Sequence, residues 1–432
     1  MEPAPTPAAR PAFREALGFW LKLGFISFGG PTGQIAILHA ELVERRRWIS
    51  EGRFLHALNF CMLLPGPEAQ QLATYCGWLL HGLRGGVAAG ALFVLPSAVI
   101  LWALSWLAMA GGDVPWVAAI FRGLQPAVMA IIAAALVRLS GKALHNRVMG
   151  AVAGLAFVAI FFLQLPFAAI ILAAGVIGFL GARLLPGQFI NAGMLPAETD
   201  SGSDDAPARP AHVAGIAAIC AGLWMAPVLT AGSVFGWNSV FAELGIFFSK
   251  AALITFGGAY AVLPYVAQQA VEQHGWLTTD QMMSGLALAE TTPGPLIMVL
   301  QFVGFAAGWQ HPGGFSPLTA GTLAAALTTW VTFVPSFLFI FTLAPFIERL
   351  RHNRALHGAL STITAAVVGV ILNLAVWFGM HAIVPGPGQI DFPALILAAG
   401  LFLGMWRRGW GVIPVILAGA ISGLVGMGIF GR

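Results

Sequence analysis

A repeat at an offset of 228 residues constrains this chain more strongly than any other feature of its sequence. The offset pairs two helix-breaking motifs in each copy: Phe28, Gly29 and Gly30 match Phe256, Gly257 and Gly258, and Pro65, Gly66 and Pro67 match Pro293, Gly294 and Pro295. A spacing of 36 residues separates the first glycine of one motif from the first proline of the other in both copies. A duplicated chain with matching helix breaks is typical of a secondary transporter whose substrate lies between two halves. The alternative that these motifs only shape tight helix crossings stays open.

The composition identifies the class of protein. Of the 432 residues, 58% are hydrophobic and only 9% are charged, whereas about a quarter of a soluble chain is charged. Long apolar stretches joined by short polar loops predict an all-α polytopic membrane protein, because no stretch alternates as a barrel strand would. The pI near 9.3 does not indicate a nucleic-acid partner. The basic residues lie mostly in loops, where they set the orientation of the chain in the membrane.

The sequence offers little for enzymatic or metal chemistry. Cys61, Cys76 and Cys220 are too few and too scattered for a disulfide framework or a thiolate metal site. No nucleophile–base pair and no HExxH motif appears. We therefore expect neither an enzyme, nor a metal site, nor a cofactor.

The distribution of Lys and Arg favours re-entrant hairpins over simple crossings. A full crossing needs about 20 residues, and thirteen apolar segments reach or approach that length. Thirteen crossings would place the arginines at 45–47 opposite the basic residues of 138–147, against the cytoplasmic bias of such residues. The conflict disappears if segments 13–38 and 54–81 are hairpins that enter and leave from the cytoplasm. Segment 213–233 has no counterpart in the first half, so its crossing inverts the second half.

The predicted fold is thus an all-α polytopic membrane protein made of two homologous halves of inverted topology. Each half has two broken or re-entrant helical hairpins and about four transmembrane helices. The expected organisation is a disordered N-terminal tail (1–12), a first transporter half (13–186), a cytoplasmic linker (187–212), the inverting helix (213–233) and a second transporter half (234–432).

The chemistry at the breaks suits a small anion. A broken helix exposes N-terminal amides and the positive end of its dipole, both of which favour anions. Lys22 and Lys250 are paired by the offset, and a charge at bilayer depth costs about 2.5–3.5 kcal/mol on insertion scales. We therefore expect both lysines to coordinate substrate. The alternatives are that they extend to the interface or are neutralised by Glu15 and Glu243.

Polar residues near the breaks complete the predicted site. Hydroxyl and amide donors suit an oxyanion that needs many modest hydrogen bonds. Glu68 and Glu290 flank the Pro-Gly-Pro motifs asymmetrically and could carry a coupling proton, or else only cap helix ends. Besides the motif residues and the two lysines, the predicted substrate-binding set contains Ser27, Gln34, Glu68, Gln70, Thr255 and Glu290.

Longer stretches around the motifs resemble the chromate ion transporter family, in its long, two-domain form. They are FISFGGPTGQIA and LPGPEAQQLATYCG in the first half, and LITFGGAYAVLPY and TTPGPLIMVLQFVG in the second. The resemblance implies export of chromate across the bacterial inner membrane, giving chromate resistance, with sulfate as a close mimic. Two of the differences between the copies fall beside the motifs: Ala259 stands where the first half has Pro31, and Leu296 stands where it has Glu68.

The expected partners are chromate, sulfate as a second anion and the lipid bilayer, with a homodimer as an open arrangement. The sequence leaves the transport direction and the coupling ion undecided. A sulfate or oxyanion uptake carrier and an oxyanion channel remain the alternatives.

Overall fold

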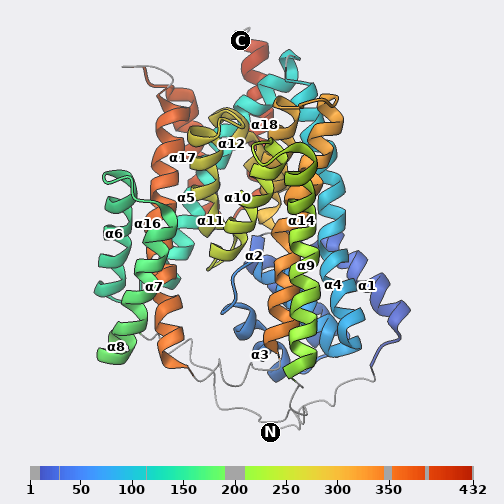
Figure 1. Cartoon of the computed structure of the whole chain (residues 1–432). Helices are drawn as coiled ribbons and strands as arrows, with labels where there is room; N and C mark the ends of the chain where they lie inside the picture. The colour runs from blue at the N-terminus through green and yellow to red at the C-terminus, as the bar shows by residue number, and fades with distance from the viewer. Residues whose placement is uncertain are drawn as a thin grey trace.

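The computed structural model describes residues 10–28, 30–112, 114–189, 210–344, 353–384 and 389–430, and the regular elements in these ranges are helices (Figure 1). Six helices are long and apolar enough to cross a membrane: 68–110, 115–143, 167–184, 211–235, 317–343 and 354–383. The chain is therefore an all-α polytopic membrane protein, as predicted. Most of the predicted tail 1–12 and linker 187–212 lies outside the described residues.

The first half is broken at both predicted motifs. Its helices are α1 (Phe13–Ile26), α2 (Gly30–His39), the π-helical turn η1 (Ala40–Arg45), α3 (Glu51–Cys61), α4 (Glu68–Ala110), α5 (Pro115–Ala143), α6 (Arg147–Phe161), α7 (Phe167–Leu184) and the short α8 (Pro186–Phe189). The glycine motif separates α1 from α2, and the Pro-Gly-Pro motif ends just before α4. Non-helical backbone at His81 and Gly82 divides α4 into a short arm and a long crossing helix.

The second half repeats this order after the additional helix α9 (Pro210–Phe235). Its elements are α10 (Val240–Ile254), α11 (Ala259–Gln268), the π-helical turn η3 (Gln269–Gln273), α12 (Thr279–Thr291), η4 (Leu296–Met298), α13 (Val299–Gln310), α14 (Pro317–Leu343), α16 (Arg354–Ile383), α17 (Phe392–Arg408) and α18 (Val412–Phe430). The kink inside α4 corresponds to the loop between α13 and α14.

The turns that follow α2 and α11 have the same backbone geometry. The amide of Trp48 donates to the carbonyl of Leu42 over 2.9 Å, and that of Trp276 donates to Ala270 over 2.8 Å. Arg47 and Gly275 both take a positive φ, 54° and 60°. The sequence repeat is therefore also a repeat of local structure.

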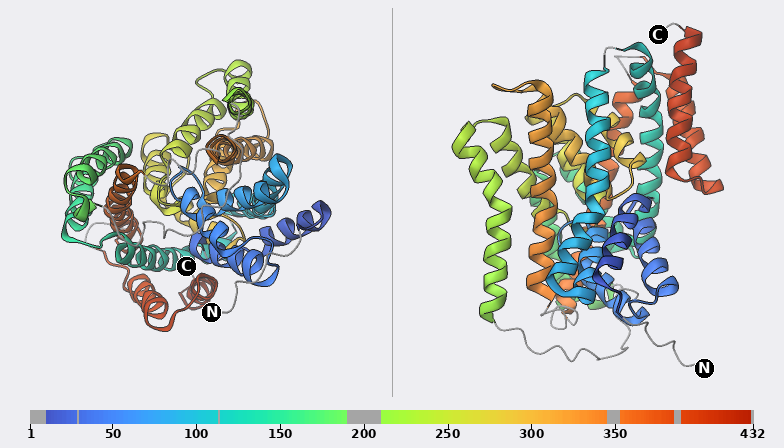
Figure 2. Two further views of the ribbon diagram at one scale, coloured as in Figure 1. Left: turned by 90° about the horizontal axis from the view of Figure 1, so that it is seen from below. Right: turned by 90° about the vertical axis from the view of Figure 1, so that its right-hand side faces the viewer.

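The two copies lie toward opposite ends of the molecule. In Figure 1, α1 and α3 lie in its lower part and α10 and α12 in its upper part, with α2 and α11 nearer the middle. The long helices α4 and α14 run through most of the height (Figure 2, right).

Packing between the halves is reciprocal. Helix α5 of the first half packs against α17 and α18 of the second, while α16 of the second packs against α6 and α7 of the first. Helix α1 packs on α4, and α10 correspondingly packs on α14 and α13. Each half therefore packs against helices of the other.

Candidate functional site

The broken segments of the two halves are joined by a symmetric pair of backbone hydrogen bonds. The amide of Gly66 donates to the carbonyl of Thr255 over 2.7 Å, and the amide of Gly294 donates to the carbonyl of Ser27 over 2.7 Å. These two bonds are related by the 228-residue offset. Each glycine-motif break thus pairs with the Pro-Gly-Pro break of the opposite half. Backbone polar groups freed at membrane depth need such partners.

The residues that accept these bonds are held at the ends of their helices. Ser27 ends α1 and Thr255 ends α10, and both are fully buried. The Ser27 hydroxyl donates to the carbonyl of Leu23 over 2.7 Å, and the Thr255 hydroxyl donates to that of Ala251 over 2.6 Å. Because their hydroxyls bond within their own helices, both residues position backbone rather than present a side chain to a ligand.

The central glycines of the Pro-Gly-Pro motifs have no room for a side chain. Gly66 has φ 123° and Gly294 has φ 104°. A Cβ on Gly294 would lie 2.6 Å from Cβ of Ser97 in α4, and one on Gly66 would lie 3.2 Å from Oγ of Ser336 in α14. Both serines follow a proline inside a long helix. Among the described residues, neither buried hydroxyl has a hydrogen-bond partner.

Four helix N-termini surround a small cavity between these breaks. The cavity has a volume of about 10 Å³, which is close to the minimum for one water molecule. Its walls are the first residues of α2, α4, α11 and the continuous η4–α13 helix: Pro31, Gln34, Pro67, Glu68, Ala69, Ala259, Pro295, Leu296 and Ile297.

Three of these helices begin without side-chain caps. The residues before α4, α11 and η4 are Pro67, Gly258 and Pro295, and none caps its helix through a side chain. The first amides of a helix have no partner within the helix, and an N-terminus attracts anions. The cavity is thus a place where helix ends from both halves converge.

Side-chain amides brace the breaks. Gln34 is buried and its Nε2 donates to the carbonyl of Gly294 in the other half. Nε2 of Gln71 donates to the carbonyl of Pro65 over 2.7 Å. Gln70 is also fully buried, and within the described part of the chain neither atom of its amide has a partner. Gln34 therefore lines the cavity from the first half and also binds the backbone of the second half.

The two predicted acidic residues lie in different surroundings. Glu68 lines the cavity, and its Oε1 lies 3.7 Å from where a Cβ on Gly258 would stand. The Glu290 carboxylate instead accepts a hydrogen bond of 2.6 Å from the Tyr260 hydroxyl. Glu290 is not among the residues that line the cavity. The structure therefore brings only Glu68 to the meeting point of the helix ends.

The structure does not bring Lys22 and Lys250, which the sequence predicts to coordinate substrate, to this cavity. Both side chains are exposed, and neither lines the cavity. In α1 the buried face is formed by residues such as Phe19, Trp20 and Leu23, which leaves Lys22 on the outer face. The exposed positions favour the alternative that the lysines extend to an interface.

The acidic residues predicted to neutralise these lysines pair elsewhere. Glu15 lies 3.6 Å from Arg46, and Glu243 lies 3.8 Å from His274. These two pairs are again related by the 228-residue offset. They tie the outer ends of α1 and α10 to the turns after η1 and η3.

Of the remaining predicted residues, Pro67 and Pro295 line the cavity, and Gly66, Gly258, Pro293 and Gly294 are buried around it. Phe28, Gly30, Pro65, Phe256 and Gly257 are half-buried at the breaks, and Gly29 lies outside the described residues. Sequence reasoning left Pro31, Ala69, Ala259, Leu296 and Ile297 out of the predicted set. The repeat could have found them, because the offset pairs Pro31 with Ala259 and Ala69 with Ile297.

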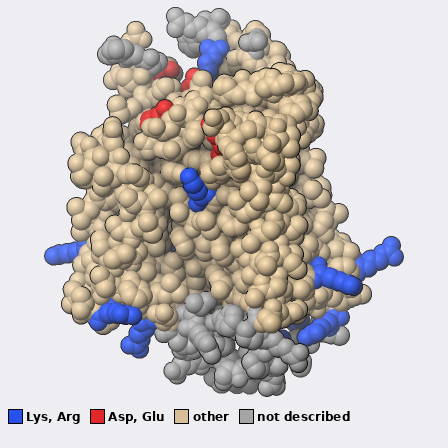
Figure 3. Space-filling view, viewed as in Figure 1, with Lys and Arg blue, Asp and Glu red and all other residues tan. Residues whose placement is uncertain are grey.

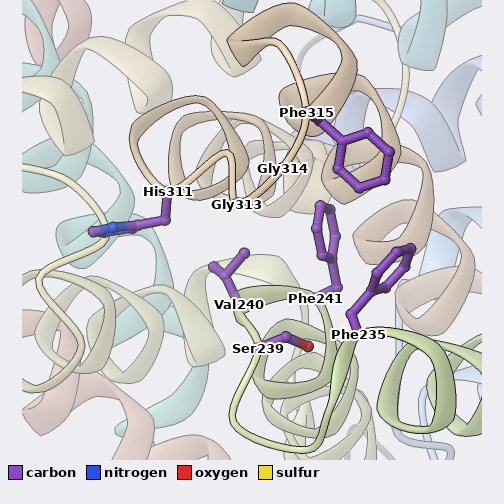
Figure 4. A pocket seen from close by; sticks show the side chains of 8 residues that line it. All are labelled: Phe235, Ser239, Val240, Phe241, His311, Gly313, Gly314 and Phe315. Carbon is purple, nitrogen blue, oxygen red and sulfur yellow. The ribbon is translucent and has the colours of Figure 1, made fainter.

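A larger cavity of about 330 Å³ lies where the α9–α10 turn meets the loop before α14 (Figure 4). The rings of Phe235, Phe241 and Phe315 pack together along it, with centroids 5.1–6.1 Å apart. His311 and Ser239 are its polar side chains, and no Lys or Arg lines it. Its largely apolar wall does not suit an oxyanion.

The sequence matches one protein family in two regions. The family model described as "Chromate transporter" matches residues 14–179 and 242–424, two regions whose starts are 228 residues apart. The chain is 34% identical to a chromate transport protein of Pseudomonas aeruginosa, over 98% of this chain and 94% of the relative. It is 28% identical to a chromate transport protein of Cupriavidus metallidurans, over 95% and 92%. It is 26% identical to a probable chromate transport protein of Synechococcus elongatus, over 96% and 95%. No solved structure matches it.

Proposed function

Because the chain belongs to the chromate transporter family, we propose that it is a carrier that moves chromate outward across the bacterial inner membrane. The observation that carries the proposal is the cavity walled by four helix N-termini, two from each half, of which those of α4, α11 and η4 have no side-chain cap. The proposed binding site is this cavity, with Gln34 as its neutral hydrogen-bond donor.

The charge of these helix ends suits a dianion. Each N-terminus is equivalent to roughly +0.5 elementary charge, so four together supply about +2 before screening. Amides and dipoles fixed in the fold need no basic side chain beside the ligand. An anion can therefore bind at this cavity without Lys22 or Lys250 beside it.

The small size of the cavity favours a carrier over a channel. About 10 Å³ leaves room for one water molecule and not for a tetrahedral oxyanion. Binding therefore requires the tips to separate, and the bonds from Gly66 to Thr255 and from Gly294 to Ser27 are the contacts that would open. Rocking of one half against the other around this point would expose the site to either side in turn.

The charge distribution orients the molecule in the membrane, and the membrane potential then favours outward transport of an anion. In Figure 3 most Lys and Arg side chains gather toward the lower end of the molecule, where α1 and α3 lie in the same view, and Asp and Glu toward the upper end. Cytoplasmic loops are enriched in basic residues, so we assign the lower end to the cytoplasm. A divalent anion that leaves a cell with a negative interior gains about 2 × 2.3 kcal/mol per 100 mV. Export driven by this potential would protect the cell from chromate.

The test is uptake of labelled chromate into inverted membrane vesicles, whose outer face is the cytoplasmic face. We expect saturable uptake that a lumen-positive potential accelerates and that excess sulfate reduces. Wild-type vesicles that take up no more chromate than vesicles without the protein would refute the proposal. Flux that does not saturate and shows no counterflow would indicate a channel and not a carrier.

A matched pair of glycine variants locates the transport path in the same vesicles. Gly258 has φ 89° and faces Glu68 across the cavity, whereas Gly154 in α6 has open space around it. Gly258→Leu should abolish chromate uptake, while Gly154→Leu should retain it. Equal uptake by the two variants, each compared at equal protein level, would remove the cavity from the path.

A further inference from the structure

The cavity is symmetric in its backbone and asymmetric in its charge. Glu68 at the start of α4 and Leu296 at the start of η4 occupy equivalent positions in the two halves. The Glu68 carboxylate lies against Gly258, the residue that precedes α11. Leu296 brings no charge to the cavity from the opposite side. One of the four helix ends thus already has an anion of the protein beside it.

We propose that the Glu68 carboxylate occupies part of the oxyanion site, and that chromate binds there only when Glu68 is protonated. The inference rests on the proposed function, because it concerns the same cavity. Two anions beside one helix end in a water-poor site repel each other strongly, so the carboxylate must lose its charge when the oxyanion enters. Each binding event then takes one proton from solution onto a carboxylate oxygen of Glu68. No bond within chromate forms or breaks.

The groups that face Glu68 are consistent with a carboxylate that changes its protonation. Lys142, in the last turn of α5, acts on it electrostatically, and the Glu68 carboxylate in turn acts on the thiol of Cys61 at the end of α3. Lys142 is exposed, and no Lys or Arg is among the described residues that line the cavity with Glu68. From α11 the group that faces Glu68 is the uncharged backbone at Gly258.

The second acid, Glu290, is half-buried and serves as the control. The Glu290 carboxylate accepts the Tyr260 hydroxyl hydrogen bond over 2.6 Å, and Arg138 of α5 acts on this pair electrostatically. Glu290 does not line the cavity. Its titration should therefore leave chromate binding unaffected.

The experiment measures chromate binding to the purified full-length protein across a range of pH, for wild type, Glu68→Gln and Glu290→Gln. Chromate itself titrates, so the informative quantity is the ratio of each variant's affinity to that of wild type at the same pH. Above the pH at which Glu68 ionises, the wild-type affinity should fall by up to tenfold per pH unit relative to Glu68→Gln. The ratio for Glu290→Gln should stay flat.

Proton uptake provides the second measurement. In weakly buffered solution, wild type should take up about one proton more per bound chromate than Glu68→Gln does. Glu68→Ala removes the same carboxylate and should behave as Glu68→Gln does, which covers the case in which one variant fails to fold. Parallel affinity profiles with equal proton uptake would overturn this inference and leave the proposed function standing. Absence of chromate binding in wild type and in every variant would overturn both.

Discussion

Replacing Gly294 with alanine tests the close approach between the second Pro-Gly-Pro break and α4. The new Cβ would lie 2.6 Å from Cβ of Ser97 and 2.8 Å from its Oγ. Cβ of Ser97 is fixed to the backbone of α4, so it cannot move away as the end of a flexible side chain could. The positive φ of 104° adds strain, because residues with a side chain rarely adopt it.

The two effects have separate magnitudes. A side chain in a sparsely populated backbone conformation costs about 1–3 kcal/mol. Excess volume in a well-packed region costs about 1–3 kcal/mol more. Gly294→Ala should therefore lower the free energy of unfolding by about 2–6 kcal/mol. It should also disturb the hydrogen bond from the Gly294 amide to Ser27, and chromate uptake with it.

A double variant separates strain from crowding. Ser97→Gly removes the crowding atoms, so Gly294→Ala added to Ser97→Gly should cost only the backbone strain, about 1–3 kcal/mol. The assay is unfolding of the purified protein by sodium dodecyl sulfate, followed by circular dichroism. Gly154→Ala in α6 is the matched control, since Gly154 has open space around it. If Gly294→Ala is as stable as Gly154→Ala, or if Ser97→Gly relieves nothing, the reasoning is refuted.

Four further variants follow from the same structure. Gln34→Ala should destabilise the protein by about 1–3 kcal/mol in the same unfolding assay, because it leaves a buried carbonyl of the opposite half without its donor; a change near zero would show that this bond contributes nothing. Lys22→Ala and Lys250→Ala should keep chromate uptake within about twofold of wild type after correction for protein level, since both side chains are exposed; loss of uptake in either would return that lysine to the site. Tyr260→Phe removes the 2.6 Å hydrogen bond to Glu290 and should cost about 1.5–3 kcal/mol of unfolding free energy, and an unchanged value would contradict the geometry.

Much of the fold could be predicted from the repeat. Matching breaks at one offset imply two copies of one unit, and broken helices at membrane depth imply a shared polar meeting point. The helix starts at Gly30, Glu68, Ala259 and Leu296 follow from the same motifs. Hydrogen bonds between the breaks of the two halves could be expected, but the sequence does not tell which residues pair, such as Gly66 with Thr255.

The lysines show where hydropathy stops being informative. In a soluble helix, polar residues mark the outer face, but a membrane helix is apolar toward lipid and toward protein alike. Leu21 and Phe25 are exposed beside Lys22, while Leu23 is buried. The sequence of α1 therefore does not tell which face packs on α4.

The serines that face the Pro-Gly-Pro glycines were missed for a different reason. Ser97 and Ser336 are equivalent by structure, since each follows a proline in a long crossing helix. They are 239 residues apart in the sequence and not 228, because the loop between α13 and α14 is longer than the kink at Gly82 and because α14 has more residues before Ser336 than α4 has between the kink and Ser97. A search at one fixed offset does not find this pair, whereas a comparison of Pro-Ser dipeptides within the long helices would have found it.

The central claim is that two copies of one unit enter the membrane from opposite sides and meet at the cavity. Glu44 and Glu272 are exposed, are related by the 228-residue offset and lie in the equivalent turns η1 and η3. The direct measurement is labelling of Glu44→Cys and Glu272→Cys, each as the single cysteine of an active protein, with a thiol reagent that cannot cross the membrane. Position 44 should react only from the cytoplasmic face and position 272 only from the opposite face. Reaction of both positions from the same compartment would contradict the account.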